Sequence, residues 1–256
     1  MVITLEQIII FILILSRCTG MVIFAPVFSA KEINFVIRVA LIIWVSGLLI
    51  FIVPLPSVIP TGSMMILVTL LIEFAIGAAI GFTADLLIAG VEFAGGIMDT
   101  QAGLSVAAVL DPSSGINAAI FQQFLRKVVV LLFIILDGHH MVLSAIVNSF
   151  YLLPVASPVN MPEGALFLVS LGTDLFKLGV ILSAPIILVI FIVDFSFGIL
   201  NRVAEQINVF QLGFQIKPSI ALIVFLAITP GLVSVISGLM ESVMENLAHL
   251  MGALST

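Results

Sequence analysis

Five carboxylates inside or beside long apolar runs are the residues of this chain whose chemistry would matter most. Asp85, Glu92 and Asp99 follow one another at seven-residue steps, which on one continuous helix places them within roughly 40° of one another. Such an acidic face suits a water-filled path or a basic partner, and the solvated end of a helix would look the same. Glu73 lies early in one apolar run and Asp194 lies late in another. Either could serve as a proton-relay carboxylate.

The other polar groups within the apolar runs point away from metal chemistry. His139 and His140 are adjacent, so on a helix they would point about 100° apart and could not hold one metal ion as an i,i+4 pair does. Asp174 and Lys177 are three residues apart and most simply neutralise each other. The single cysteine, Cys18, provides neither a disulfide nor a Cys-based zinc site within the chain. We therefore expect no metal site.

The sequence also lacks the patterns of an enzyme. Ser105 follows Gly103 and Leu104, but it does not lie in the sharply turned Gly-x-Ser-type motif that a serine nucleophile needs. The sequence contains no Walker-type phosphate loop and no dinucleotide-binding fingerprint. We expect a protein without catalytic residues or a cofactor, so energy from ATP would have to come from another protein.

The composition is that of a membrane protein. Hydrophobic residues make up 62% of the chain and charged residues 9%, against about 45–50% and about 25% in soluble domains. The net charge of −6 provides no basic surface for nucleic acid. No polar linker divides the chain, so we expect a single domain over residues 1–256 whose surface meets membrane lipid.

Apolar runs of about 20 residues predict an all-α fold of about six long hydrophobic helices, some of them kinked by proline. Within the third run, Gly77 and Gly81 have the small-xxx-small spacing that lets two helices approach closely. The predicted spans cover residues 8–30, 33–53, 64–90, 128–153, 165–200 and 218–240, and a short amphipathic tail follows the last one.

The basic residues predict the orientation of these spans, because lysine and arginine accumulate on the cytoplasmic side. With six spans and an external N-terminus, six of the eight basic residues fall on that side. They are Lys31, Arg38, Arg126, Lys127, Arg202 and Lys217. The main polar interruption, residues 95–115, is then cytoplasmic or dips back from that side. Its glycines and its Leu-Asp-Pro-Ser-Ser-Gly turn predict irregular backbone, which must line water, sit in protein or lie outside the hydrocarbon.

Three stretches in order carry a resemblance to a known family. Residues 101–115 (QAGLSVAAVLDPSSG), 137–140 (DGHH) and 208–217 (NVFQLGFQIK) resemble the signature stretches of the FliR family. Its members are export-gate subunits of the bacterial flagellar type III secretion apparatus and are related to the SctT subunits of injectisomes. The resemblance covers essentially the whole chain.

The resemblance implies a subunit without catalytic chemistry in the bacterial inner membrane, at the flagellar basal body. Such a subunit assembles with FliP and FliQ into a helical, closed export channel, works beside FlhB, and lets unfolded flagellar proteins pass. Family members resemble a FliP-like part fused to a FliQ-like part made of helical hairpins. In this chain these parts would be residues 1–200 and 201–256.

The resemblance also implies a loop that plugs the closed pore with apolar side chains. The matching residues are Gly103, Leu104, Ser105, Val106, Val109, Leu110, Asp111 and Pro112. Val106 and Val109 are smaller than the side chains that some members place there, so we expect a partner's methionines to supply more of the seal. The alternative is a proton-coupled secondary membrane transporter that uses Glu73, Asp194 or the acidic face.

Overall fold

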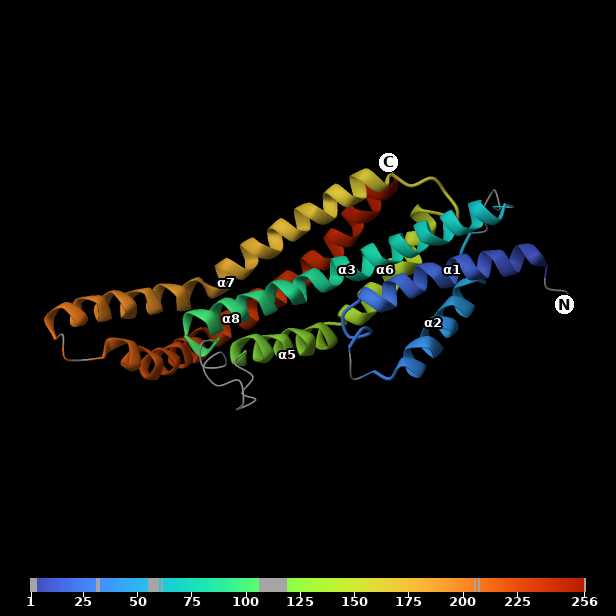
Figure 1. Ribbon diagram of the computed structural model, residues 1–256. Coiled ribbons are helices and arrows are strands. Elements are labelled where there is room, and N and C mark those ends of the chain that lie inside the picture. Colours follow the sequence, from blue (N-terminus) through green and yellow to red (C-terminus); the bar gives the residue numbers. More distant parts are fainter. Residues whose placement is uncertain are drawn as a thin grey trace. The chain divides into compact units, whose positions relative to one another are not determined.

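The computed structural model describes residues 4–30, 33–54, 60, 62–105, 119–204, 206 and 208–255 (Figure 1). Within these residues α-helix is the only regular secondary structure, which confirms the predicted all-α class. The helices are α1 (Leu5–Phe24), α2 (Phe35–Leu49), α3 (Ser63–Gln101), α5 (Ile120–Ile135), α6 (Gly138–Leu152), α7 (Met161–Val203) and α8 (Val209–Ser255).

Polar residues just ahead of four helices fix where those helices begin. Thr4 forms a capping box with Gln7 before α1, accepting from the Gln7 N–H and donating its own N–H to the Gln7 amide. Asn34, Asn160 and Asn208 each accept a backbone N–H from the first turn of α2, α7 and α8. These bonds satisfy donors that a helix cannot satisfy within itself.

The lengths of the helices agree with several of the predicted spans. In the described part of the chain, α1, α3, α7 and residues 211–255 of α8 are long and apolar enough to cross a membrane. The consecutive helices α5 and α6 add a fifth span if this bent pair is counted as one. The run 33–53 is helical only over the 15 residues of α2, fewer than the roughly 20 that a perpendicular span requires.

One predicted span is bent and two predicted boundaries were wrong. Within the run 128–153, Asp137 adopts a left-handed conformation (φ 57°) and separates α5 from α6. The polar interruption was expected to begin at Gly95, but α3 continues through Gly95 and Gly96 to Gln101. The last helix does not end near residue 240 either.

Helix α8 continues to Ser255 because its final turns carry an apolar stripe. Val243, Leu247, Leu250 and Leu254 are all buried and recur at helical spacing. Leu254 packs against Gly164 near the start of α7, and the Leu254 carbonyl accepts the Asn160 N–H. The expected amphipathic tail is therefore a packed part of the helix.

The chain forms two compact units, each built from separate stretches of sequence. Unit 1 comprises Met1–Leu87, Phe133–Gly172 and Met240–Thr256. Unit 2 comprises Ile88–Leu132 and Thr173–Leu239. The prediction of a FliP-like part and a FliQ-like part concerns a different division and stays a prediction.

In unit 1, α1 and α3 pack at backbone contact, and Figure 1 draws them side by side. A Cβ atom at Gly77 would overlap the Arg17 carbonyl oxygen, and one at Gly81 would lie 2.6 Å from the Met21 carbonyl oxygen. On the facing helix, a Cβ at Gly20 would overlap the backbone at Phe74. Any side chain at these positions would push the helices apart.

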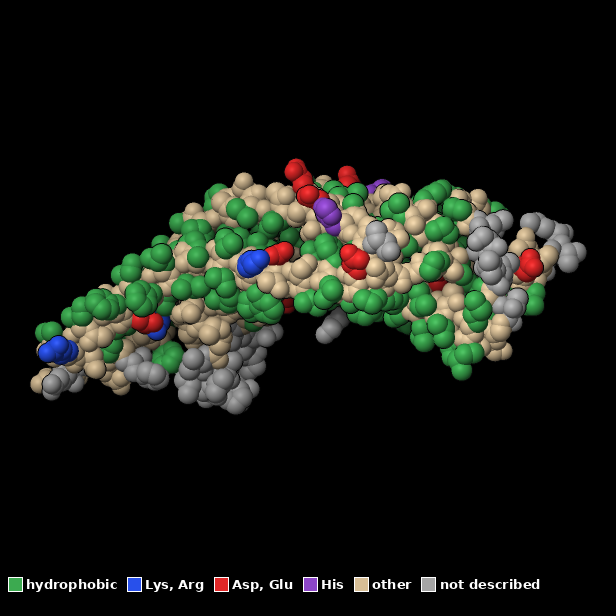
Figure 2. Space-filling view, turned by 90° about the horizontal axis from the view of Figure 1, so that it is seen from above, with side chains coloured by type: hydrophobic (Ala, Val, Ile, Leu, Met, Phe, Trp, Pro, Cys, Tyr) green, Lys and Arg blue, Asp and Glu red, His purple; other side chains and the backbone are tan. Residues whose placement is uncertain are grey.

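Large apolar side chains cover much of the surface, and few charges appear on the face drawn in Figure 2. Trp44, Phe51 and Phe191 are 67%, 82% and 67% exposed. Exposed apolar surface on this scale is typical of a chain that meets lipid or other subunits.

Candidate functional site

An ion pair between Arg17 of α1 and Glu73 of α3 lies buried in unit 1. The Arg17 Nε atom is 2.5 Å from Glu73 Oε2, and the two residues are 0% and 1% exposed. Arg17 also donates from Nη1 to the Ser149 hydroxyl at 3.1 Å and to the Leu153 carbonyl at 3.0 Å. Its guanidinium carbon lies 4.1 Å from the centre of the Phe150 ring.

Both carboxylate oxygens of Glu73 are engaged, since Oε1 accepts the Ala156 N–H at 3.0 Å. The cluster therefore joins α1, α3, α6 and the segment that follows α6. A carboxylate held by these two partners links the helices together, whereas a proton-relay carboxylate would need a path for protons. Glu73 was a candidate proton-relay carboxylate from its place in an apolar run, and that run gave no indication of its partner. Arg17, a lone cation inside an apolar run, was the signal that could have found it.

In unit 2, Asp99 joins the end of α3 to the start of α5. Its two oxygens accept the N–H groups of Phe121 and Gln122, each at 2.9 Å, and the residue is 2% exposed. These N–H groups belong to the first turn of α5, which has no carbonyl partners within the helix and carries a partial positive charge. Asp99 thus caps α5 from another helix.

Glu92 extends the same contact two turns earlier on α3. It accepts from the Gln122 side chain at 3.0 Å and pairs with Arg126 at 2.7 Å. Next to Asp99, Gly95 meets the backbone of Gln122, where an added Cβ would lie 2.7 Å from its nitrogen. The acidic residues at 92 and 99 therefore face α5, which supplies the basic partner. Asp85 is half-buried and belongs to unit 1.

The cap matters because Asp99 and Phe121 flank the segment that carries the predicted plug. The Gly103 N–H donates to the Thr100 carbonyl at 3.1 Å, and Gly103 has φ +78°, the left-handed conformation that ends many helices. Leu104 and Ser105 follow it in a helical conformation. Val106, Val109, Leu110, Asp111 and Pro112 lie outside the described residues.

Gly103 also lines a pocket of about 470 Å³ in unit 2. Asp194 of α7 and Lys217 of α8 line it as well, and their charged groups are 2.5 Å apart. Asp194 thus has a cationic partner. In the same unit Asp174 and Lys177 form the predicted i,i+3 pair at 2.8 Å, with both side chains exposed.

Three side chains at the break between α5 and α6 lie close together. Donor atoms of Asp137, His139 and His140 lie within 4.8 Å of one another, and the centres of the two imidazole rings are 4.4 Å apart. The adjacent histidines were expected to leave the helix about 100° apart, and their donor atoms nevertheless come close together. Helical spacing fixes the direction in which a side chain leaves the axis, but two long side chains can still converge.

Comparison with known proteins gives extensive similarity. A family model described as "Bacterial export proteins, family 1" matches residues 8–243. The flagellar biosynthetic protein FliR of Pectobacterium carotovorum subsp. carotovorum is 29% identical over 240 residues, covering 94% of this chain and 92% of that protein. FliR of Bacillus subtilis (strain 168) is 25% identical, with 94% of each chain covered. The Yop proteins translocation protein T of Yersinia pestis is 27% identical over 184 residues, covering 71% of this chain and 70% of that protein.

Breaking the buried ion pair should destabilise unit 1. We expect Glu73→Leu to lower the free energy of unfolding by about 3–5 kcal/mol, because it leaves the Arg17 charge buried and unpaired. The double variant Arg17→Met/Glu73→Leu should recover most of that loss. Unfolding of the detergent-solubilised protein, followed by helical circular dichroism, measures the free energy of unfolding of the single and the double variant. A single variant within about 1 kcal/mol of the wild type would contradict the structural role.

Removing the Asp99 cap should loosen the start of α5. We expect Asp99→Ala to raise amide hydrogen exchange in residues 119–124 by about tenfold or more, since charge-assisted hydrogen bonds of about 1.5–3 kcal/mol are lost. Asp174→Ala is the matched control, because its exposed pair with Lys177 stabilises by only a few tenths of a kcal/mol. Equal exchange in the two variants would refute the capping role.

Proposed function

The chain belongs to the family of bacterial export proteins that includes the flagellar FliR subunits, and from this membership we propose that it is an export-gate subunit of the flagellar type III secretion apparatus. The observation that carries the proposal is similarity along nearly the whole chain, with the family model spanning residues 8–243. The flagellar relatives align with 94% of the chain and the Yop translocation protein with 71%. This difference favours the flagellar system over an injectisome.

In this proposal the chain forms a closed channel with FliP and FliQ subunits in the inner membrane, beside FlhB, at the flagellar basal body. Unfolded flagellar proteins pass through that channel. The exposed apolar surface supports such an assembly, because subunits that contact both lipid and one another need more apolar surface than a soluble monomer. The chain contributes positioning and a seal, and no catalytic step is assigned to it.

The mechanism we propose is steric. The segment 104–110 occludes the axial pore and is displaced when an unfolded substrate enters. Support comes from the residues on either side of the stretch between α3 and α5. Gly103 turns the chain out of α3, while Asp99 holds the start of α5 beside the end of α3. Both ends are therefore next to the same turn of α3, so the displacement we propose would leave the contact between α3 and α5 in place.

The rival function is a proton-coupled secondary transporter. It depends on carboxylates free to gain and lose protons in a membrane path. Glu73, Glu92 and Asp194 have cationic partners, and Asp99 is bound to backbone N–H groups. These contacts favour the gate over the transporter.

Deleting Val106–Val109 tests the gate directly. We expect cells that assemble the apparatus with this variant to leak small ions, because the seal is shortened while the Asp99 cap is kept. Leakage of an impermeant dye or of sodium ions measures the effect. The double variant Asp174→Ala/Lys177→Ala, which removes an exposed pair on α7, is the control and should not leak. An unchanged leak in assembled complexes carrying the deletion would contradict the plug.

The same cells separate the gate from the transporter. The leak should vanish when FliP is absent, because the pore belongs to the assembly. The purified chain alone in liposomes should move no solute in response to a pH gradient. Movement by the chain alone would instead support the rival.

A further inference from the structure

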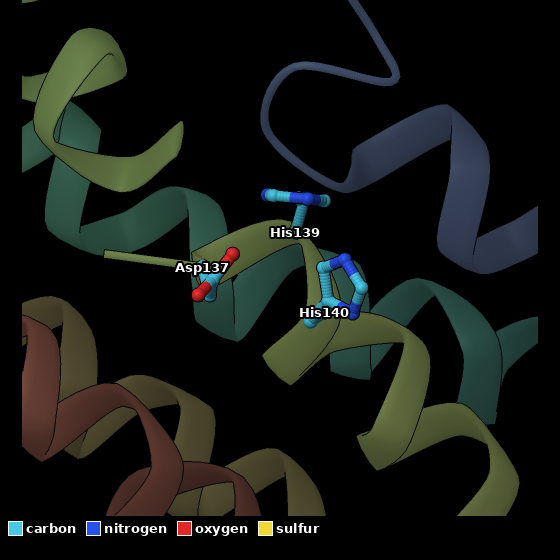
Figure 3. Close-up of side chains that lie close together, drawn as sticks. All are labelled: Asp137, His139 and His140. Carbon is cyan, nitrogen blue, oxygen red and sulfur yellow. The ribbon is translucent and has the colours of Figure 1, made fainter. Parts of the chain in front are cut away.

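The break between α5 and α6 gathers three side chains that can each bind a metal ion. Asp137 precedes α6, and His139 and His140 lie in its first turn. Figure 3 shows their side chains projecting from this one turn. The carboxylate and imidazole donor atoms lie within 4.8 Å of one another. All three residues belong to unit 1.

The usual partners of these groups are missing among the described residues. Asp137 occupies the N-cap position of α6, yet its side chain makes no capping hydrogen bond. The Nδ1 atom of His139 is buried and has no hydrogen-bond partner in the described part of the chain. Buried polar atoms in proteins are nearly always satisfied, so this ring nitrogen is available to a water molecule or a metal ion.

The backbone at this point is shaped in a way that brings the carboxylate toward the imidazoles. Asp137 has φ 57°, a left-handed conformation that is uncommon for a residue with a side chain. A Cβ at the next residue, Gly138, would lie 2.5 Å from the ring of the buried Phe133. The sharp turn therefore needs glycine at 138 and sets Asp137 beside the first turn of α6.

We propose that Asp137, His139 and His140 form a binding site for a divalent first-row transition metal ion such as Zn²⁺. Two imidazoles and one carboxylate are a ligand set that such ions accept. In a tetrahedral zinc site the ligand atoms lie about 3.4 Å apart, from bonds of about 2.0–2.1 Å. Asp137 and His140 are exposed, so their side chains are free to rotate. Such rotation can bring the donor atoms from within 4.8 Å of one another to the separation that the metal ion requires.

The site is incomplete within this cluster, because three ligands leave a fourth position of a tetrahedral ion open. That position would take water or a ligand from a neighbouring subunit. The bound ion would also fix the α5–α6 break by tying the N-cap residue to the helix that it precedes. The inference stands on the geometry of unit 1 and is independent of the proposed role in export.

Cobalt binding by the full-length chain tests the site. The protein, purified in detergent with an affinity tag that contains no histidine and treated with a chelator, is titrated with Co²⁺. We expect one equivalent to bind per chain, with visible d–d absorption that Zn²⁺ abolishes by displacement. Absence of a stoichiometric, Zn²⁺-displaceable spectrum would overturn the proposal.

Variants then assign the ligands. His140→Ala and Asp137→Asn should each weaken Co²⁺ binding by at least about tenfold, since even the loss of an outer-shell partner weakens metal sites by about 10–100-fold. Both positions are exposed, so these substitutions are expected to leave the helical circular dichroism unchanged. His249→Ala is the matched control, because this exposed histidine lies elsewhere on α8, and it should bind like the wild type. Undiminished binding by His140→Ala, or a loss in His249→Ala equal to that in His140→Ala, would overturn the assignment.

Discussion

The buried pair of Arg17 and Glu73 is the interaction on which the packing of unit 1 depends. An unpaired charge inside an apolar interior is destabilising by several kcal/mol, so α1, α3, α6 and the segment after α6 must meet where the two charges pair. The close approach of α1 and α3 makes this possible. Gly77 lies one turn after Glu73 and admits the backbone at Arg17 into contact. The glycine and the ion pair therefore depend on each other, because a side chain at position 77 would separate the charges.

Helix α3 repeats this arrangement within unit 2. Gly95 and Asp99 are also one turn apart, and both meet the first turn of α5: the glycine by backbone contact and the carboxylate by accepting two N–H groups. In each unit a small residue allows a neighbouring backbone to come near, and an acidic residue on the same face then satisfies a charge or a set of amide donors. The second of these contacts holds the two ends of the segment that carries the proposed plug.

The sequence was sufficient for the fold class and for some local pairs. Long apolar runs predicted a helical membrane protein, and the spacing of Asp174 and Lys177 predicted their contact. Other features depended on tertiary packing. Gly95 was interpreted as irregular backbone, although it serves close packing within a helix, and composition does not distinguish these uses of glycine. The partner of Glu73 lies 56 residues away, beyond any local pattern. The convergence of Asp137, His139 and His140 depends on a left-handed residue that no spacing rule predicts.

In the proposed gate, residues 104–110 lie in the path of exported protein. Site-specific photocrosslinking in cells whose export is arrested by a stably folded substrate measures whether they do. A crosslinker at position 109 should capture the arrested substrate, and one at position 44, an exposed site on α2, should not. If the arrested substrate crosslinks to FliP subunits but not to position 109, the plug assignment is contradicted.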